Sequence, residues 1–244
     1  MEGIHIALAP EVLGSFFGLP ITNTLITSLS VAGLILAAAF IGRSKLKELP
    51  GRVQALFEEG LEFTLSYMEE VLEDKKLARF FFPLIVSLFI FIFASNVLQF
   101  LPGVGSIGFY HGEEFLPLFR SVNTDLNVTL ALSMIVLIVI QIAGIATLGV
   151  LKYFSKFVSF ISPLRFAIGI IDLFSEVARL VSFSFRLFGN IFAGEAIIAV
   201  VLYFAPLLLP VPVILFELFV GLIQAAIFAL LTLFFIKLAR VEAH

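Results

Sequence analysis

An arginine and a glutamate inside an otherwise lipid-soluble segment are the residues of this chain best placed for chemistry. Arg186 and Glu195 lie in the stretch SFSFRLFGNIFAGE, residues 182–195. An ionised group at membrane depth costs about 2.5 to 3.5 kcal/mol on insertion scales, so such groups usually mark functional sites. On a helix this spacing places the two on opposite faces, about 13 Å apart along the axis. They therefore do not neutralise each other within one helix.

Polar residues recur along one side of this segment and along one side of the next apolar segment. Arg186 and Asn190 share a helical face at i, i+4 spacing, and Arg179 lies one heptad before Arg186 on the same face. Glu217 and Gln224 are seven residues apart and also share a face. The two polar faces are able to meet or to line a water-filled cavity.

The charged groups of these faces differ in their acid–base properties. Glu195 and Glu217 are able to bind and release protons, whereas the guanidinium of Arg186 stays charged in proteins. A fixed cation beside a mobile carboxylate makes that carboxylate release its proton, and the cation cannot relay protons itself. The pattern therefore indicates an electrostatic gate on a proton path. The alternative is a structural pair of Arg186 with a glutamate that ties two helices together.

The composition indicates a membrane protein that crosses the bilayer several times. Apolar residues make up 61% of the 244, and the mean hydropathy is +1.14. The chain has no cysteine, and its histidines, His5, His111 and His244, show no metal-ligand spacing. We therefore expect no disulfide, no metal, no cofactor and no nucleic-acid partner, and the lipid bilayer as surroundings.

The elements that must position these residues are five membrane-spanning helices in a single membrane domain of residues 1–244, an all-α fold. We expect the spans at residues 21–41, 80–101, 126–151, 164–204 and 213–236. Residues 50–74 predict an amphipathic helix instead, at the cytoplasmic surface. Its polar face is acidic, which favours packing against protein over binding to lipid.

The span at residues 164–204 is unusually long. It contains no proline, and as one helix it would extend roughly 60 Å, about twice the hydrocarbon thickness of a bilayer. Either it breaks near Gly189 or Gly194, or it crosses the membrane at a steep tilt. We favour one tilted helix that forms a hairpin with residues 213–236.

The basic residues set the orientation. Twelve of the fifteen lysines and arginines fall on one assigned side of the membrane, and only Arg120 falls on the other. By the positive-inside rule, the N-terminal segment 1–20 is outside and the C-terminus is cytoplasmic.

Several further polar residues lie in or beside the spans. We expect Asn96 to make an interhelical hydrogen bond, which is more common than a transport role. Asn123 or Thr124 is expected to cap the third span. Weaker candidates for a functional role are Asp172, Glu176, Arg179, Asp125 and Asn96; for the first three of these we favour a structural role.

The stretch SFRLFGNIFAGE, residues 184–195, resembles the signature of subunit a of the F-type rotary ATP synthase. Further resemblances to the same family lie at residues 4–11, 95–96, 123–127, 221–225 and 227–232. The resemblance implies a subunit that is not an enzyme on its own. It implies the proton-channel stator of the membrane sector, CF(0), in a bacterial plasma membrane, beside a ring of c subunits and the b subunits of the peripheral stalk.

The resemblance also assigns roles to residues. It implies two half-channels offset across the membrane, with Arg186 facing the ring carboxylate, Asn190 beside it and Gln224 opposite. Glu195 and Glu217 would belong to the outer half-channel. Asp172 would be a candidate for the inner half-channel.

The sequence leaves alternatives open for the pH dependence, for the coupled ion and for the function itself. The residue at the position of Glu217 is often a histidine in relatives, which leaves the pH dependence of the outer half-channel open. We expect H⁺ rather than Na⁺ as the coupled ion, because the hairpin has no cluster of oxygen ligands beyond carboxylates. The alternative function is an ion-coupled secondary transporter, although no inverted repeat is apparent. A purely structural scaffold would leave Arg186 unexplained.

Overall fold

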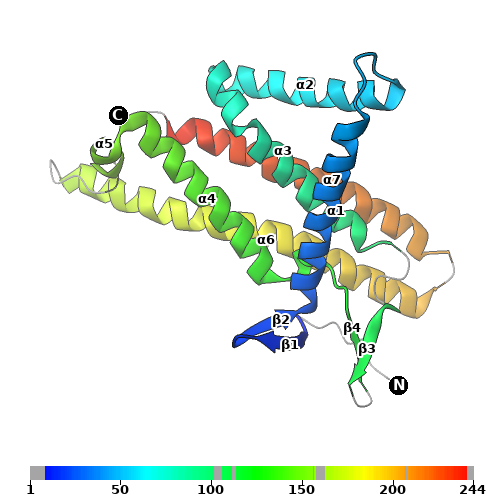
Figure 1. The fold of residues 1–244 in the computed structure, drawn as a ribbon. Helices are drawn as coiled ribbons and strands as arrows, with labels where there is room; N and C mark the ends of the chain where they lie inside the picture. Colours follow the sequence, from blue (N-terminus) through cyan, green and yellow to red (C-terminus); the bar gives the residue numbers. More distant parts are fainter. Residues whose placement is uncertain are drawn as a thin grey trace.

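A computed structural model of the chain describes residues 9–101, 106–111, 114–155, 157, 163–206 and 208–240. His5, His244 and most of the N-terminal resemblance, residues 4–8, lie outside the described residues. Five helices are long and apolar enough to cross a membrane (Figure 1), which confirms the five predicted spans. They are α1 (Asn23–Lys45), α3 (Lys75–Leu98), α4 (Leu126–Leu148), α6 (Pro163–Phe204) and α7 (Pro210–Ala239).

The described part of the chain also contains two shorter α-helices. The helix α2 (Arg52–Leu72) corresponds to the segment expected at residues 50–74, and it crosses one end of the molecule in Figure 1. Its C-terminal residues Met68 and Leu72 are buried against the helix bundle, whereas Leu56 and Phe57 near its start are exposed. The helix α5 (Val150–Ser155) follows Gly149, whose φ of +81° suits glycine and separates α5 from α4.

The helix boundaries follow from capping and from proline. The side chain of Asp125 accepts a bond from the Asn127 backbone N–H, so Asp125 caps α4. Our expectation that Asn123 or Thr124 would be the cap was wrong, because both belong to the 3₁₀ helix η2 (Val122–Thr124), which ends just before Asp125. The last span begins at Pro210 rather than at residue 213, since the first turn of a helix tolerates proline.

Two short antiparallel hairpins were not anticipated from the sequence. Strand β1 (Val12–Phe16) pairs with β2 (Leu19–Thr22), and β3 (Gly108–His111) pairs with β4 (Glu114–Pro117). The first turn consists of Phe17 and Gly18, both with positive φ, which matches the twist of a two-residue hairpin. Both hairpins lie at the same end of the molecule, opposite α2 (Figure 1).

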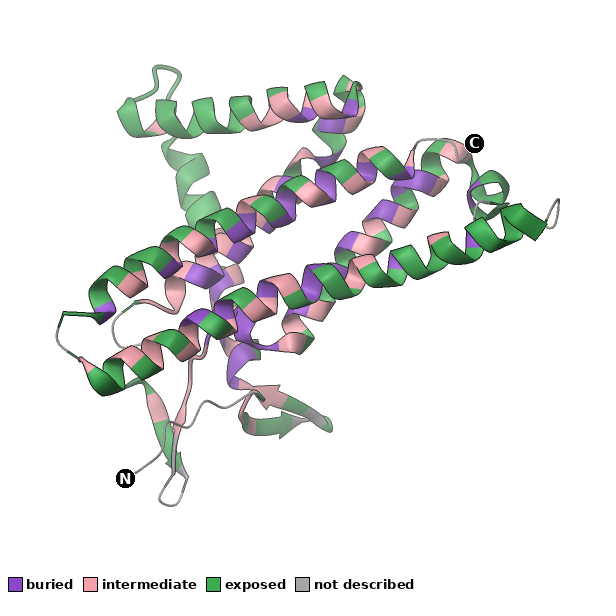
Figure 2. Cartoon of the chain, turned by 180° about the vertical axis from the view of Figure 1, so that it is seen from behind, coloured by how far each residue is buried: buried purple, intermediate pink, exposed green. Residues whose placement is uncertain are grey.

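The core joins four long helices and the end of α2. Buried residues of α3, α4, α6 and α7 form one continuous apolar cluster. Phe183 of α6 and Phe228 of α7 lie edge to face with ring centroids 4.9 Å apart, which locks the two helices together. Figure 2 shows buried residues on the inner faces of these helices and exposed residues along their outer faces.

The helices α6 and α7 run side by side as a hairpin (Figure 1). The 42 residues of α6 form one continuous helix, about 63 Å long, with no break at Gly189 or Gly194. Most residues of its first third, 163–175, are exposed. The hairpin therefore presents a long apolar surface that no other described part of the chain covers.

Candidate functional site

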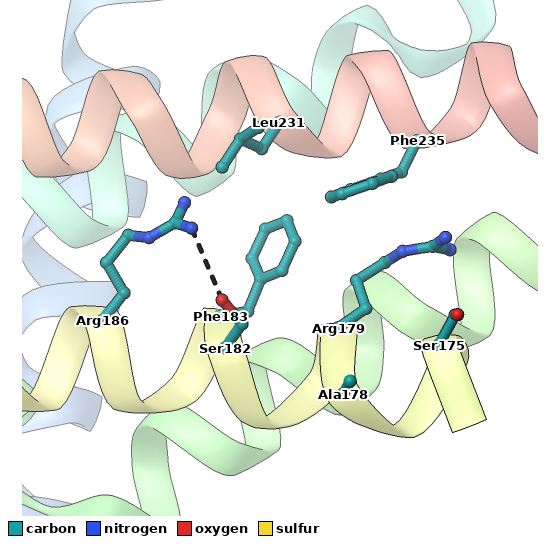
Figure 3. Close-up of a pocket in the computed structure, with 8 residues that line it drawn as sticks. All are labelled: Ser175, Ala178, Arg179, Ser182, Phe183, Arg186, Leu231 and Phe235. Carbon is teal, nitrogen blue, oxygen red and sulfur yellow. Dashed lines mark hydrogen bonds between the residues drawn. The ribbon is translucent and has the colours of Figure 1, made fainter. Parts of the chain in front are cut away.

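Arg186 lies in a pocket between α6 and α7. The pocket has a volume of about 310 Å³ (Figure 3), and its lining residues are Ser175, Ala178, Arg179, Ser182, Phe183, Arg186, Leu231 and Phe235. We refer to it as the Arg186 pocket. The guanidinium donates to the Ser182 hydroxyl at 3.4 Å, across one helical turn. No carboxylate pairs with Arg186 among the residues that the structure describes.

Arg179 lines the same pocket one heptad away, as the spacing predicted, but in a different electrostatic setting. Its Nη1 donates to Oε2 of Glu176 at 2.8 Å. Its guanidinium also lies over the ring of Phe235, 4.1 Å from the centroid. The two cations of the pocket are therefore not equivalent, because Arg179 is paired with a carboxylate and Arg186 is not.

One turn beyond Arg186, a hydrogen bond joins the two helices of the hairpin. Asn190 Nδ2 donates to Gln224 Oε1 at 2.8 Å. Gln224 is 3% exposed, and its own amide nitrogen has no partner within the described ranges. The structure thus joins two of the predicted residues, Asn190 and Gln224, one helical turn away from Arg186.

Glu217 packs against α6 at Gly194. It is 4% exposed, and its carboxylate lies where a Cβ at residue 194 would be. Its Oε2 has no hydrogen-bond partner among the described side chains and backbone groups. Only glycine at residue 194 leaves room for this carboxylate.

Glu195 lies at the next position of α6, and its Oε2 is also buried without a partner in the described structure. Thr124 and the Arg120 guanidinium lie close enough to Glu195 to influence the ionisation of its carboxyl group. Buried oxygens normally have hydrogen-bond partners. Two buried carboxylate oxygens that lack a protein donor are able to accept a bond from water or a proton.

Asn96 and Asp125 hold helices together, and the predicted interhelical bond of Asn96 is confirmed. Asn96 Nδ2 donates to the Gly221 carbonyl of α7 at 3.0 Å, and its Oδ1 accepts from Asn123 Nδ2 at 2.6 Å. Asp125 Oδ2 accepts from the Thr24 hydroxyl at 2.6 Å, which joins the starts of α1 and α4.

One carboxylate oxygen of Glu176 accepts two hydrogen bonds. Besides Arg179, Gln141 of α4 donates to its Oε2 at 3.1 Å, and Tyr153 of α5 donates to Gln141 Oε1. Asp172, one turn before Glu176, is half-buried, and the described residues offer it no such partners. Sequence reasoning missed Gln141, although an amide in the middle of an apolar span is a signal of an interhelical contact.

The described residues contain no group of three or more histidine, cysteine, aspartate or glutamate side chains that could hold a metal ion. The candidate residues instead form a series along the hairpin. Glu176 and Arg179 lie at one end, then Arg186, then Asn190 with Gln224, and then Glu195 and Glu217. Along one helix pair there are thus an Arg–Glu ion pair, an arginine without a carboxylate partner in the described structure, and two further glutamates.

Comparison with known proteins gives a consistent result. The family model of the ATP synthase A chain matches residues 24–237. ATP synthase subunit a of Mycobacterium tuberculosis is 36% identical over 235 residues, which cover 92% of this chain and 90% of the relative. The same subunit of Moorella thermoacetica is 33% identical over 218 residues, covering 89% and 90% of the two chains. That of Campylobacter concisus is 34% identical over 205 residues, covering 83% and 82%. This chain therefore belongs to the ATP synthase A chain family.

Proposed function

We propose that this chain is the proton-conducting stator of the membrane sector of an ATP synthase. The observation that carries the proposal is Arg186, a cation inside the helix hairpin with no carboxylate partner in the described structure. Arg186 is only partly buried within this chain, but an ionised group at membrane depth is costly, so its retention requires a function. That function is to attract a carboxylate that this chain does not itself supply.

The proposed carboxylate belongs to a rotating ring of c subunits beside α6. The outward side of α6 carries exposed apolar residues over most of its length, as a helix that contacts a ring or lipid requires. Arg186 then stabilises the ionised form of each ring carboxylate as it passes. The carboxylate releases its proton on one side of the arginine and is able to bind another on the other side.

Two half-channels bring protons to and from the ring. We assign Glu195 and Glu217 to the outer one, because both have buried carboxylate oxygens without protein donors. We assign the Arg186 pocket, which Arg179 also lines, to the inner side. Asn190 and Gln224 lie between the two regions and hold the hairpin together there.

The proposed setting is a bacterial plasma membrane, with the N-terminus outside and the C-terminus cytoplasmic. The hairpin of α6 and α7 is steeply tilted in it, since about 63 Å of helix has to fit within about 30 Å of hydrocarbon. On this orientation α2 lies at the cytoplasmic surface. Its exposed apolar residues then suit the b subunits of the peripheral stalk, and the acidic residues face water.

Proton transfer is the proposed chemistry, and the coupled ion is H⁺. The transferred free energy is about 2.3 kcal/mol per charge for each 100 mV of membrane potential. The continuous helix α6 differs from the interrupted helices that hold ions in many secondary transporters.

The test uses the complete ATP synthase in membrane vesicles. Arg186→Ala should assemble, yet lower coupled ATP synthesis about a hundredfold or more, because it removes the one preorganised charge on the path. Arg186→Lys keeps a positive charge on a flexible stem, so it should suppress passive proton leak more than it restores coupling. Near-normal ATP synthesis by Arg186→Ala would show that the arginine is not the gate.

A further inference from the structure

Two cations line the Arg186 pocket, and they have different polar partners. Arg179 and Arg186 are seven residues apart on α6, about 10.5 Å along its axis. A negatively charged group that moves along this helix would be attracted by both. The contacts of Arg179 therefore decide whether the pocket has one attractive charge or two.

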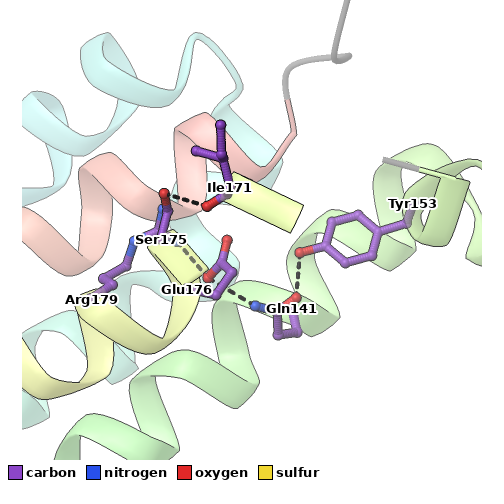
Figure 4. Close-up of polar contacts among 6 residues, drawn as sticks. All are labelled: Gln141, Tyr153, Ile171, Ser175, Glu176 and Arg179. Carbon is purple, nitrogen blue, oxygen red and sulfur yellow. Dashed lines mark hydrogen bonds and ion pairs between the residues drawn. The ribbon is translucent and has the colours of Figure 1, made fainter. Parts of the chain in front are cut away.

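A chain of hydrogen bonds from two other helices ends on the carboxylate that pairs with Arg179 (Figure 4). The Tyr153 hydroxyl donates to Gln141 Oε1, and Gln141 Nε2 donates to Glu176 Oε2 at 3.1 Å. Arg179 Nη1 donates to the same oxygen at 2.8 Å. We call Tyr153, Gln141 and Glu176 the Tyr153 network. Gln141 of α4 contacts Glu176 directly, and Tyr153 of α5 holds Gln141, so together they orient the carboxylate toward Arg179.

Tyr153 is itself held in place. It is 1% exposed, and its ring packs against Gly144 of α4, where a Cβ would overlap it. The same Cβ would lie 3.0 Å from the carbonyl oxygen of Ala239 at the end of α7. Burial, and next the negative charge of Glu176, raise the pKa of the Tyr153 phenol. The phenol therefore keeps its proton and remains a donor.

Aromatic rings separate the paired cation from the unpaired one. The guanidinium of Arg179 lies over Phe235, and the Phe235 ring is 5.6 Å from that of Phe183. In Figure 3 these two rings lie between Arg179 and Arg186. Among the described residues, the Ser182 hydroxyl, at 3.4 Å, is the one hydrogen-bond partner of Arg186.

We propose that the Tyr153 network neutralises Arg179 and thereby leaves Arg186 as the uncompensated cation of the Arg186 pocket that a ring carboxylate meets. This inference rests on the function proposed above. Glu176, Gln141 and Tyr153 are positioning residues, because they act through Arg179. Without Glu176, Arg179 would attract the ring carboxylate to a point seven residues away from Arg186. This attraction would delay the passage of the ring carboxylate.

A double-mutant cycle tests the charge balance. The readout is ATP-driven proton pumping by the complete ATP synthase in inverted vesicles, normalised to the amount of this subunit. Glu176→Gln should lower the pumping rate about tenfold, since one uncompensated charge nearby changes carboxylate ionisation by about one decade or more. Arg179→Gln should also lower it, because it leaves an uncompensated anion. The double variant should recover to within about threefold of the wild type, because it is again neutral.

If the pair of Glu176 and Arg179 has a purely structural role, the pumping rates of the variants should rank differently. The double variant removes both ends of the ion pair, so it would then pump no faster than the slower single variant, and that result would overturn the proposal. If Glu176→Gln does not assemble, Arg179→Gln and the double variant give the same comparison.

Tyr153→Phe tests the positioning role. It should lower pumping about twofold in the wild-type background and have no effect in the double variant, where Glu176 no longer carries a charge to position. An equal loss in both backgrounds would contradict positioning. Tyr203→Phe, at an exposed site far along α6, is the matched control.

Arg186→Ala in the same vesicles keeps the two proposals distinct. If it pumps normally, the gate function fails. If it does not pump and the double variant fails to recover, only the inference about the Tyr153 network fails.

Discussion

The carboxylate of Glu217 on α7 lies so close to the backbone of Gly194 on α6 that a Cβ at residue 194 would overlap it. The two helices of the hairpin are thus in contact through a titratable group. Any side chain at residue 194 has to push the glutamate or the helix aside.

Gly194→Ala should therefore displace Glu217 and slow proton transport. Because the overlap is with the end of a flexible side chain, we expect the carboxylate to move aside with little loss of stability. The measurement is passive proton conductance of vesicles stripped of the catalytic sector, together with thermal unfolding of the complex. Gly33→Ala in α1 is the control, because its Cβ would meet open space. Equal conductance for both variants would show that the position of Glu217 is not critical.

The two glutamates should each contribute to the pH profile of proton transport. Glu195→Gln and Glu217→Gln each remove a titrating group and keep its shape, so we expect passive conductance to fall about tenfold or more while the complex still assembles. Glu62→Gln on the exposed side of α2 is the control. Unchanged rates and pH profiles in both single variants and in the double variant would exclude these residues from the proton path.

The bond between Asn190 and Gln224 should stabilise the hairpin. Asn190→Ala leaves the buried Gln224 Oε1 without its donor, which costs about 1 to 3 kcal/mol. Thermal unfolding of the protein in detergent measures the loss, and Asn127→Ala at an exposed site is the comparison. Removing both amides should cost less than the sum of the single losses. Additive losses would mean that the two residues are not coupled.

The proposed orientation can be read by chemical labelling. The chain has no cysteine, so cysteines introduced at the exposed residues Ser44 and Ser106 are unique. An impermeant thiol reagent added outside should label residue 106 and leave residue 44 unlabelled. Labelling of residue 44 from outside, with residue 106 protected, would reverse the topology.

The sequence predicted those parts of the fold that depend on local pattern. Five apolar runs gave five long helices, and the spacing of Arg179 and Arg186 placed both in one pocket. These features follow from helix geometry alone, and hydrophobicity is a strong signal for membrane-spanning helices.

Long-range contacts could not be predicted in the same way. The approach of Arg120 to Glu195 depends on where the loop before α4 contacts α6. No local sequence pattern predicts that contact. The cap was misplaced because Asn123, Thr124 and Asp125 are all good capping residues. Tertiary hydrogen bonds decided between them, since Asn123 is bonded to Asn96. The strand pairs were missed because each is only four or five residues long.

The uninterrupted helix α6 fixes the order and the angular register of its polar groups. Arg179 and Glu195 are separated by about 24 Å along a single rigid axis. One inserted residue near Gly189 would turn every later side chain by about 100° relative to Arg186, and would move Glu195 to another face of the helix. Chain length within this segment is therefore as strictly constrained as residue identity, because a deletion that spares every polar side chain would still misalign them.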